Sequence, residues 1–212
     1  MPNWCSNDLV ITGKPKMLNK LLKQVTTTAS EAGDEATSFD FNKVIPRPAN
    51  VDWYSWSIEN WGTKWNACDI SFLSNGDWLD HYDDSTWESG EVTITFQTAW
   101  SPPVPVLTQL SKDNPSVKIV HKFYETGAGF YGTYEYKKGM ITVEEQGNFG
   151  METPCEIYIE YLGDSYHHYC QDCGDYFDCE GEVKDYCVEC EAQRNEQEKE
   201  LWELDENTSK AS

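Results

Sequence analysis

The sequence predicts an α+β protein: a ferredoxin-like sandwich with an aromatic-rich insertion, followed by a small zinc-ribbon or treble-clef module and a helix. Strand and helix patterns alternate as β-α-β twice, a tryptophan-rich stretch separates the two halves, and two CxxC pairs lie near the end. We expect a sheet domain over residues 1–163, a four-cysteine zinc module with an acidic helix over 164–206, and a disordered tail over 207–212.

The first half begins with an apolar stretch at residues 8–12, which predicts a strand. Apolar side chains then recur at helical spacing over 17–25, and Pro15 suits the first turn of that helix. Residues 29–38 are expected to form a loop. Residues 39–44 are expected to form a short strand that ends before Pro46.

The second half begins at residues 91–98, where apolar and polar side chains alternate as in a half-buried strand. Ser101 and the two prolines after it predict a helix start, and Asn114–Pro115 predicts its end. Further strands are predicted at residues 67–73, 116–124, 130–136, 140–145 and 156–161. The predicted core consists of Leu9, Ile11, Leu18, Leu22, Val92, Ile94, Phe96, Leu107, Leu110, Ile119 and Phe123.

The insertion at residues 53–87 holds six of the nine tryptophans among Gly, Asn and Asp, which predicts an irregular region. Its aromatic faces and one lysine would suit a base or nucleotide. The possible ligand-binding residues are Trp53, Trp56, Trp61, Lys64 and Trp65. More often such residues build a small core beneath a long loop, and we favour that interpretation.

The chain is strongly acidic, with 16 basic and 37 acidic residues and a formal charge of −21. Residues 164–212 hold 15 acidic and 4 basic residues, a net charge of −11. Phosphate backbones are bound by Lys and Arg, so general nucleic-acid binding is disfavoured. A protein partner with a basic surface, or competition for a nucleic-acid site, suits this charge better, although acidity can also serve solubility alone.

The sequence shows neither a signal-peptide pattern at its start nor an apolar run of the ~20 residues that a membrane span needs. We therefore expect a cytoplasmic protein without membrane association, and the family resemblance described below implies that the cell is a bacterial host. In that compartment cysteines stay reduced, so the CxxC pairs predict metal binding rather than disulfides.

Four motifs suggest a family. They are Met1–Asn7 (MPNWCSN), Phe41–Pro46 (FNKVIP), Asn60–Ala67 (NWGTKWNA) and Phe96–Pro103 (FQTAWSPP). Together they resemble the YubB-type ferredoxin-like domain of phage and plasmid proteins, over about residues 1–147. The resemblance implies a ferredoxin-like fold and an accessory protein of a mobile element, and it brings no catalytic residue with it.

The C-terminal region predicts one structural zinc ion. Cys170 and Cys173 form the first CxxC pair, and Cys187 and Cys190 form the second at the start of a predicted acidic helix. Four thiolates complete a tetrahedral site and leave no position open for catalysis. Cys179 and His168 are alternative ligands, but we expect an ordinary loop cysteine and an exposed histidine there.

Two other motifs contain residue types that can carry chemistry. His81 lies close to Asp83 and Asp84, which would permit acid–base or metal chemistry, but a solvated turn is the expected structure. Gly127–Gly132 lacks the features of a phosphate-binding loop and predicts a tight connection between strands.

Without a recognisable catalytic set, the sequence predicts a non-catalytic accessory protein of a phage or mobile element. It would bind and inhibit or redirect a host protein, thereby countering host defence. The alternative is a protein that binds or sequesters a nucleotide through the Trp-rich insertion.

Overall fold

The computed structural model describes residues 3–26, 39–74, 77–79, 90–150, 153, 155–162, 167–169, 176–178, 190–197 and 199. The chain divides into two compact units, Met1–Asn148 and Phe149–Ser212. The sequence instead predicts the boundary between the two domains after residue 163. Predicted site residues His81, Asp83, Asp84, Cys170, Cys173, Cys179 and Cys187, and the tail 207–212, lie outside the described residues.

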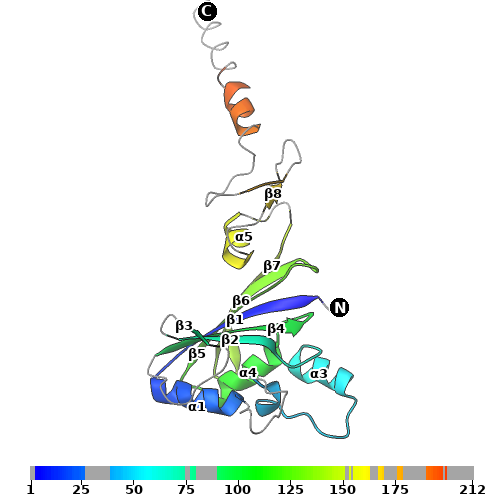
Figure 1. Ribbon diagram of the computed structural model, residues 1–212, viewed down its shortest axis with the longest axis vertical. Helices are drawn as coiled ribbons and strands as arrows, with labels where there is room; N and C mark the ends of the chain where they lie inside the picture. The colour runs from blue at the N-terminus through cyan, green and yellow to red at the C-terminus, as the bar shows by residue number, and fades with distance from the viewer. Residues whose placement is uncertain are drawn as a thin grey trace, which may run out of the picture. The chain divides into compact units, whose positions relative to one another are not determined.

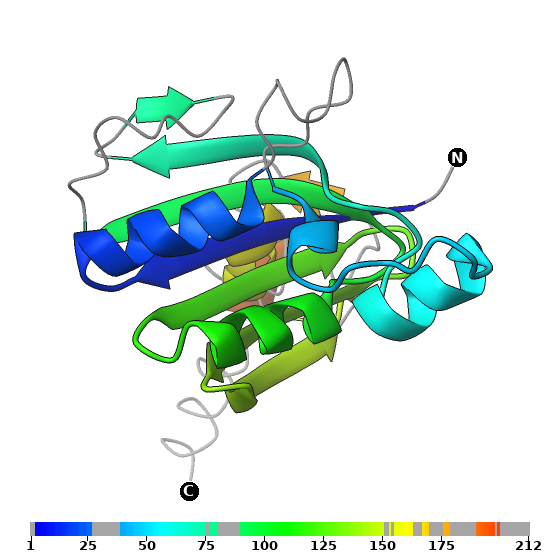
Figure 2. The same cartoon turned by 90° about the horizontal axis from the view of Figure 1, so that it is seen from below.

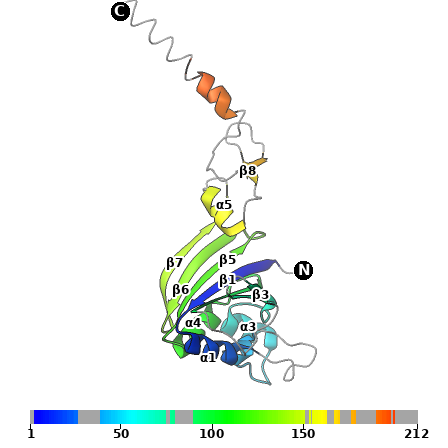
Figure 3. The ribbon, with the colours of Figure 1, turned by 60° about the vertical axis from the view of Figure 1, so that its left-hand side comes forward.

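The first unit is built on one antiparallel sheet in the order β3-β2-β4-β1-β5-β6-β7 (Figures 1 and 3). The strands are β1 (Trp4–Thr12), β2 (Cys68–Ser74), β3 (Asp77–Leu79), β4 (Glu91–Ala99), β5 (Lys118–Glu125), β6 (Phe130–Lys137) and β7 (Met140–Asn148). Strands β2-β4-β1-β5 are the four that two interleaved β-α-β units provide, so this part of the ferredoxin-like prediction is confirmed.

Helices α1 (Pro15–Val25) and α4 (Val104–Asp113) lie on one face of this sheet (Figure 2). Between them and the sheet lies the core, and all eleven residues that the sequence predicts to be buried are buried. Each buried large aliphatic side chain contributes about 1.5 to 3 kcal/mol relative to exposure. The two β-α-β halves are therefore held together chiefly by this apolar layer.

Three predicted elements are wrong. Residues 39–44 form the 3₁₀ helix η2 (Phe41–Lys43) rather than a strand, because the Asp40 carboxylate accepts the Asn42 amide hydrogen at 2.9 Å and caps a turn. The region predicted to be irregular contains the helix α3 (Trp53–Trp61). Residues 156–161 belong to the helix α5 (Cys155–Leu162) rather than to the sheet.

The second unit contains α5 and a small antiparallel hairpin in which β8 (His167–Tyr169) pairs with β9 (Tyr176–Asp178). Residues 190–197 are helical, in keeping with the predicted acidic helix. In the part of the chain that the structure describes, no helix is long and apolar enough to cross a membrane.

A buried polar network crosses the centre of the sheet. Asn7 donates from Nδ2 to the Thr98 hydroxyl at 2.9 Å, and its Oδ1 lies 3.0 Å from His121 Nε2. The other ring nitrogen of His121 lies 3.4 Å from the Tyr136 hydroxyl. Burial lowers the pKa of His121 to about 3, so the imidazole is neutral at physiological pH.

Candidate functional site

The strongest candidate for a functional surface is a group of aromatic side chains around one lysine, here called the Lys64 cluster. It consists of Trp4, Trp53, Tyr54, Lys64, Trp65 and Trp100. Each of its five aromatic side chains is between 37% and 45% exposed, although such rings usually lie in a core. Single exposed aromatics are normal, whereas a contiguous set marks an interaction site.

Lys64 lies at the centre of this cluster. Its Nζ is 4.5 Å from the centroid of the Trp65 ring, 4.9 Å from that of Trp100 and 5.7 Å from that of Tyr54. All three distances permit cation–π attraction. Within the described residues no carboxylate forms an ion pair with Lys64. The ammonium is thus surrounded by ring faces and stays available to pair with an incoming group.

The other rings extend the surface in two directions. Trp4 lies 5.9 Å from Trp65, centroid to centroid, and Trp53 lies edge to face with Tyr54 at 5.8 Å. Tyr54 in turn lies 6.3 Å from Trp100. These residues come from the start of β1, the first turn of α3, the α3–β2 connection and the residue after β4.

Helix α3 positions this surface, and each of its ends is defined by a single residue. At its start the Asp52 carboxylate accepts the Ser55 amide hydrogen at 3.0 Å. At its end Gly62 adopts φ +79°, where a Cβ would lie 2.8 Å from Pro105 Cδ. Glycine is required there for both reasons.

Hydrogen bonds fasten the end of α3 to the segment after β4. Ser101 donates its hydroxyl to the Gly62 carbonyl at 2.6 Å, and Thr63 donates to the Ala99 carbonyl at 2.8 Å. Within the same link Trp100 has φ +76°, a strained backbone conformation for a bulky side chain. The Trp100 amide donates to the Asn3 carbonyl at 2.9 Å, which ties this residue to the start of β1. The cluster therefore rests on a fixed backbone.

The structure separates the five residues predicted as a ligand site. Trp53, Lys64 and Trp65 belong to the Lys64 cluster. Trp61 is only 2% exposed and donates from its indole N–H to the Ile45 carbonyl at 3.0 Å, so it belongs to the core, and Trp56 packs edge to face against it. Sequence reasoning missed Trp4 and Trp100, which lie far apart in the chain and meet through the β1–β4 pairing.

The cysteine-rich region can be placed only in part. Cys190 is half-buried at the first position of the helical run 190–197. The first CxxC pair belongs to the segment 170–175 that joins β8 to β9. No group of three or more metal-ligating side chains occurs among the described residues, which include just one of the four predicted ligands. The zinc site remains a prediction.

Comparisons with known proteins support the fold. Residues 77–156 match a family model described as the ferredoxin-like domain in Api92-like protein. The chain also resembles the crystal structure of protein api92 from Yersinia pseudotuberculosis, with a TM-score of 0.50 at 12% identity, over 71% of this chain and 99% of that one. No curated protein matches the chain. The YubB-type resemblance stays a prediction.

Proposed function

We propose that this protein is a non-catalytic binding protein that docks on a host protein through the Lys64 cluster. The observation that carries the proposal is the gathering of five partly exposed aromatic rings, three of which surround Lys64, on a hydrogen-bonded backbone. Tryptophan and tyrosine are enriched at the residues that dominate binding energy in protein interfaces. A surface already held in place loses little conformational entropy when a partner binds.

The charge of the chain specifies the partner further. At −21, the protein attracts a basic surface over long range and speeds its encounter. Lys64 gives the centre of the cluster a local positive charge that no described carboxylate neutralises. The partner should therefore combine a broad basic surface with one acidic side chain that reaches Lys64.

The described side chains also support a non-catalytic role. Burial raises the pKa of Cys5 to about 12 and that of Cys68 to about 11, so both thiols are protonated and weakly nucleophilic at neutral pH. His121 is fully buried, where it would not reach a substrate. We assign the binding role to an accessory protein of a phage or mobile element, acting in the host cytoplasm to inhibit or redirect its target. That setting rests on the YubB-type resemblance.

We further propose that Cys170, Cys173, Cys187 and Cys190 hold one structural zinc ion. Their spacing suits a tetrahedral thiolate site, and the first pair belongs to a connection between two paired strands. Elemental analysis of purified protein should give one zinc per chain. The zinc content should fall in a Cys190→Ser variant. The melting temperature of the first unit should stay the same, because this unit is compact by itself. Protein from metal-replete cells that lacks zinc would contradict the assignment.

Affinity capture from a bacterial host lysate tests the binding role. The Lys64 cluster is removed by the double substitution Trp65→Ala and Trp100→Ala, and Met140→Ala is the matched control, because Met140 is exposed on β7 outside the cluster. We expect one protein to bind the wild type and the control but not the double variant. Binding should weaken as salt rises past ~0.15 M, where the Debye length is about 8 Å.

The competing outcome is also informative. If no cluster-dependent protein is captured at low salt, while ATP binds stoichiometrically and changes the tryptophan fluorescence of the wild type but not of the double variant, the cluster is a nucleotide site. The protein-docking proposal would then be abandoned.

A further inference from the structure

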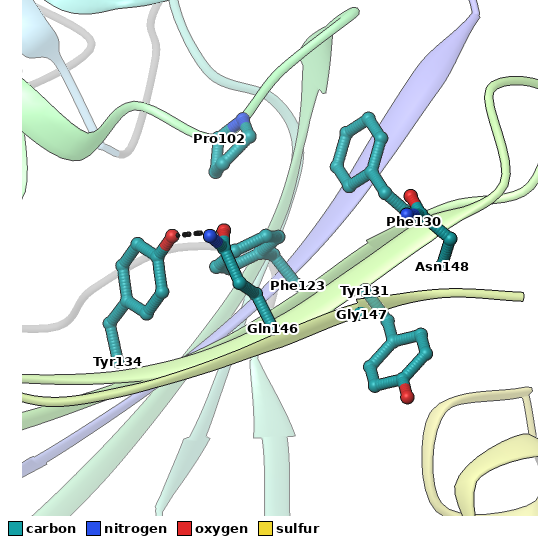
Figure 4. A pocket seen from close by; sticks show the side chains of 8 residues that line it. All are labelled: Pro102, Phe123, Phe130, Tyr131, Tyr134, Gln146, Gly147 and Asn148. Atoms are coloured by element: carbon teal, nitrogen blue, oxygen red, sulfur yellow. Dashed lines mark hydrogen bonds between the residues drawn. The ribbon is translucent and has the colours of Figure 1, made fainter.

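A pocket of about 420 Å³ lies on the helix-bearing side of β5, β6 and β7, outside the Lys64 cluster. Its volume falls within the range of small-molecule sites. Pro102, from the link after β4, faces the aromatic side chains Phe123, Phe130 and Tyr134 across it (Figure 4). The same link carries Trp100, so one short segment borders both the pocket and the Lys64 cluster.

Three aromatic rings form the apolar part of the pocket. Phe123 lies between the other two, with its centroid 5.0 Å from that of Tyr134 at an interplanar angle of 78° and 6.2 Å from that of Phe130 at 61°. The position of Phe123 depends on Gly132, because a Cβ at this glycine would lie 2.5 Å from Phe123 Cζ. Phe123 is 2% exposed and cannot readily move aside. Phe123 and Tyr134, which is 7% exposed, therefore form the closed floor of a fixed recess, and the partly exposed Phe130 offers the ring face on which a flat ring can stack.

One amide gives the pocket hydrogen-bonding specificity. The Tyr134 hydroxyl donates to Gln146 Oε1 at 2.7 Å, which orients this side chain in the pocket (Figure 4). The amide oxygen has a second lone pair, and Nε2 carries two donors. A glutamine held in this way offers an adjacent donor and acceptor, the pair that recognises the N7 and N6 edge of adenine.

The charge of the pocket favours a neutral ligand over a phosphorylated one. Among the residues that the structure describes, none of the side chains that line the pocket is basic or acidic. A phosphate would find no cation among them, and the net charge of −21 would repel it. The pocket therefore suits a neutral molecule.

We propose that this pocket binds a neutral purine nucleoside, with an adenine base that lies over the Phe123 and Tyr134 floor, stacks on Phe130 and is hydrogen-bonded to Gln146. This site is separate from the nucleotide alternative considered for the Lys64 cluster, which would use the charge of Lys64. It is also independent of the proposed protein docking. Base stacking on aromatic side chains is strong enough to make such a site measurable.

Isothermal titration of the full-length protein with adenosine tests the proposal. We expect one site per chain and weaker binding of adenosine monophosphate than of adenosine. Gln146→Leu keeps the shape but loses the hydrogen bonds, and it should weaken adenosine about tenfold or more. Gln109→Leu is the control, because Gln109 lies on α4, does not appear among the described residues that line the pocket, and donates from Nε2 to Asp113 Oδ1.

Two further variants keep the outcome unambiguous. Trp65→Ala should leave adenosine binding unchanged, and Tyr134→Phe should weaken it, because Gln146 loses its hydrogen-bond donor. The absence of adenosine binding at millimolar concentration in protein with a native melting profile would overturn the proposal. So would tighter binding of the monophosphate, or a loss of affinity in Trp65→Ala but not in Gln146→Leu.

Discussion

Trp61 and Trp65 lie four residues apart, yet they belong to opposite sides of the same segment. The inner side, with Trp61 against Phe41 and under the Arg47 guanidinium, is part of the core. The outer side, with Trp65 and Trp53 around Lys64, is exposed. The turn at Gly62 separates the inner and outer sides, because the helix ends there and the chain changes direction between Trp61 and Trp65. An aromatic-rich segment can therefore supply stability and a binding surface at once.

The largest effect should come from the inner side. Trp61→Ala removes a fully packed ring and the indole hydrogen bond to Ile45, so it should lower the free energy of unfolding by about 3 to 5 kcal/mol. Chemical denaturation of the purified variant measures this. A loss below about 1 kcal/mol, typical of a surface site, would contradict the assignment of Trp61 to the core.

The next effect is a pH dependence in the centre of the sheet. The pKa of His121 is about 3 in the folded state and 6.5 without burial, so the unfolded chain binds the extra proton between these values. The stabilisation linked to the neutral form of His121 is fully present above pH 6.5. As the pH falls below this value, the free energy of unfolding decreases by up to about 1.4 kcal/mol per pH unit. Denaturation at a series of pH values should show a shallower slope for His121→Gln. Equal slopes in the two proteins would contradict this account of His121.

A smaller effect on stability should appear at Trp100, where removal of the side chain relieves backbone strain but also removes a ring from the Lys64 cluster. Because its φ is +76°, Trp100→Gly should be more stable than Trp100→Ala by about 1 kcal/mol, while both variants lose the ring from the Lys64 cluster. Thermal melts compare the two. If the alanine variant is as stable as the glycine variant, the backbone at this position is not strained.

The smallest effect on stability should come from Trp65→Ala. This ring contacts Lys64 and Trp4 at the surface, and exposed contacts of this kind contribute about 0.5 to 1 kcal/mol. The same substitution should reduce partner capture strongly. A destabilisation comparable to that of Trp61→Ala would show that Trp65 is a core residue after all.

Elements with a clear local sequence pattern were predicted, and elements without one were missed. The centre of the sheet could be predicted because apolar Val92, Ile94 and Phe96 alternate with polar side chains over residues 91–98, and these three residues are buried in β4. Helix α3 was missed since its Trp, Tyr, Ser and Ile residues are poor helix formers, although Asp52 before it and Gly62 after it are helix-end signals.

Helix α5 was missed because its sequence has the pattern of a strand. Ile157, Ile159 and Tyr161 alternate with Glu156, Tyr158 and Glu160, and β-branched and aromatic residues of this kind are enriched in strands. Tertiary context overrides such propensities.

The candidate site could be predicted only in part. Trp53, Lys64 and Trp65 lie close in the sequence and were found, while Trp4 and Trp100 join them through strand pairing that residue spacing does not reveal. The pocket depends on Gly132 opposite Phe123 in neighbouring strands, a register that the sequence alone leaves open.

Fluorine NMR of the protein labelled with fluorotryptophan tests the central claim most directly, with signals assigned by single Trp→Phe variants. After addition of the captured partner, the signals of Trp65 and Trp100 should shift, while that of Trp61 stays unchanged. A partner that binds without moving the Trp65 and Trp100 signals would contradict the claim that the Lys64 cluster is the docking surface.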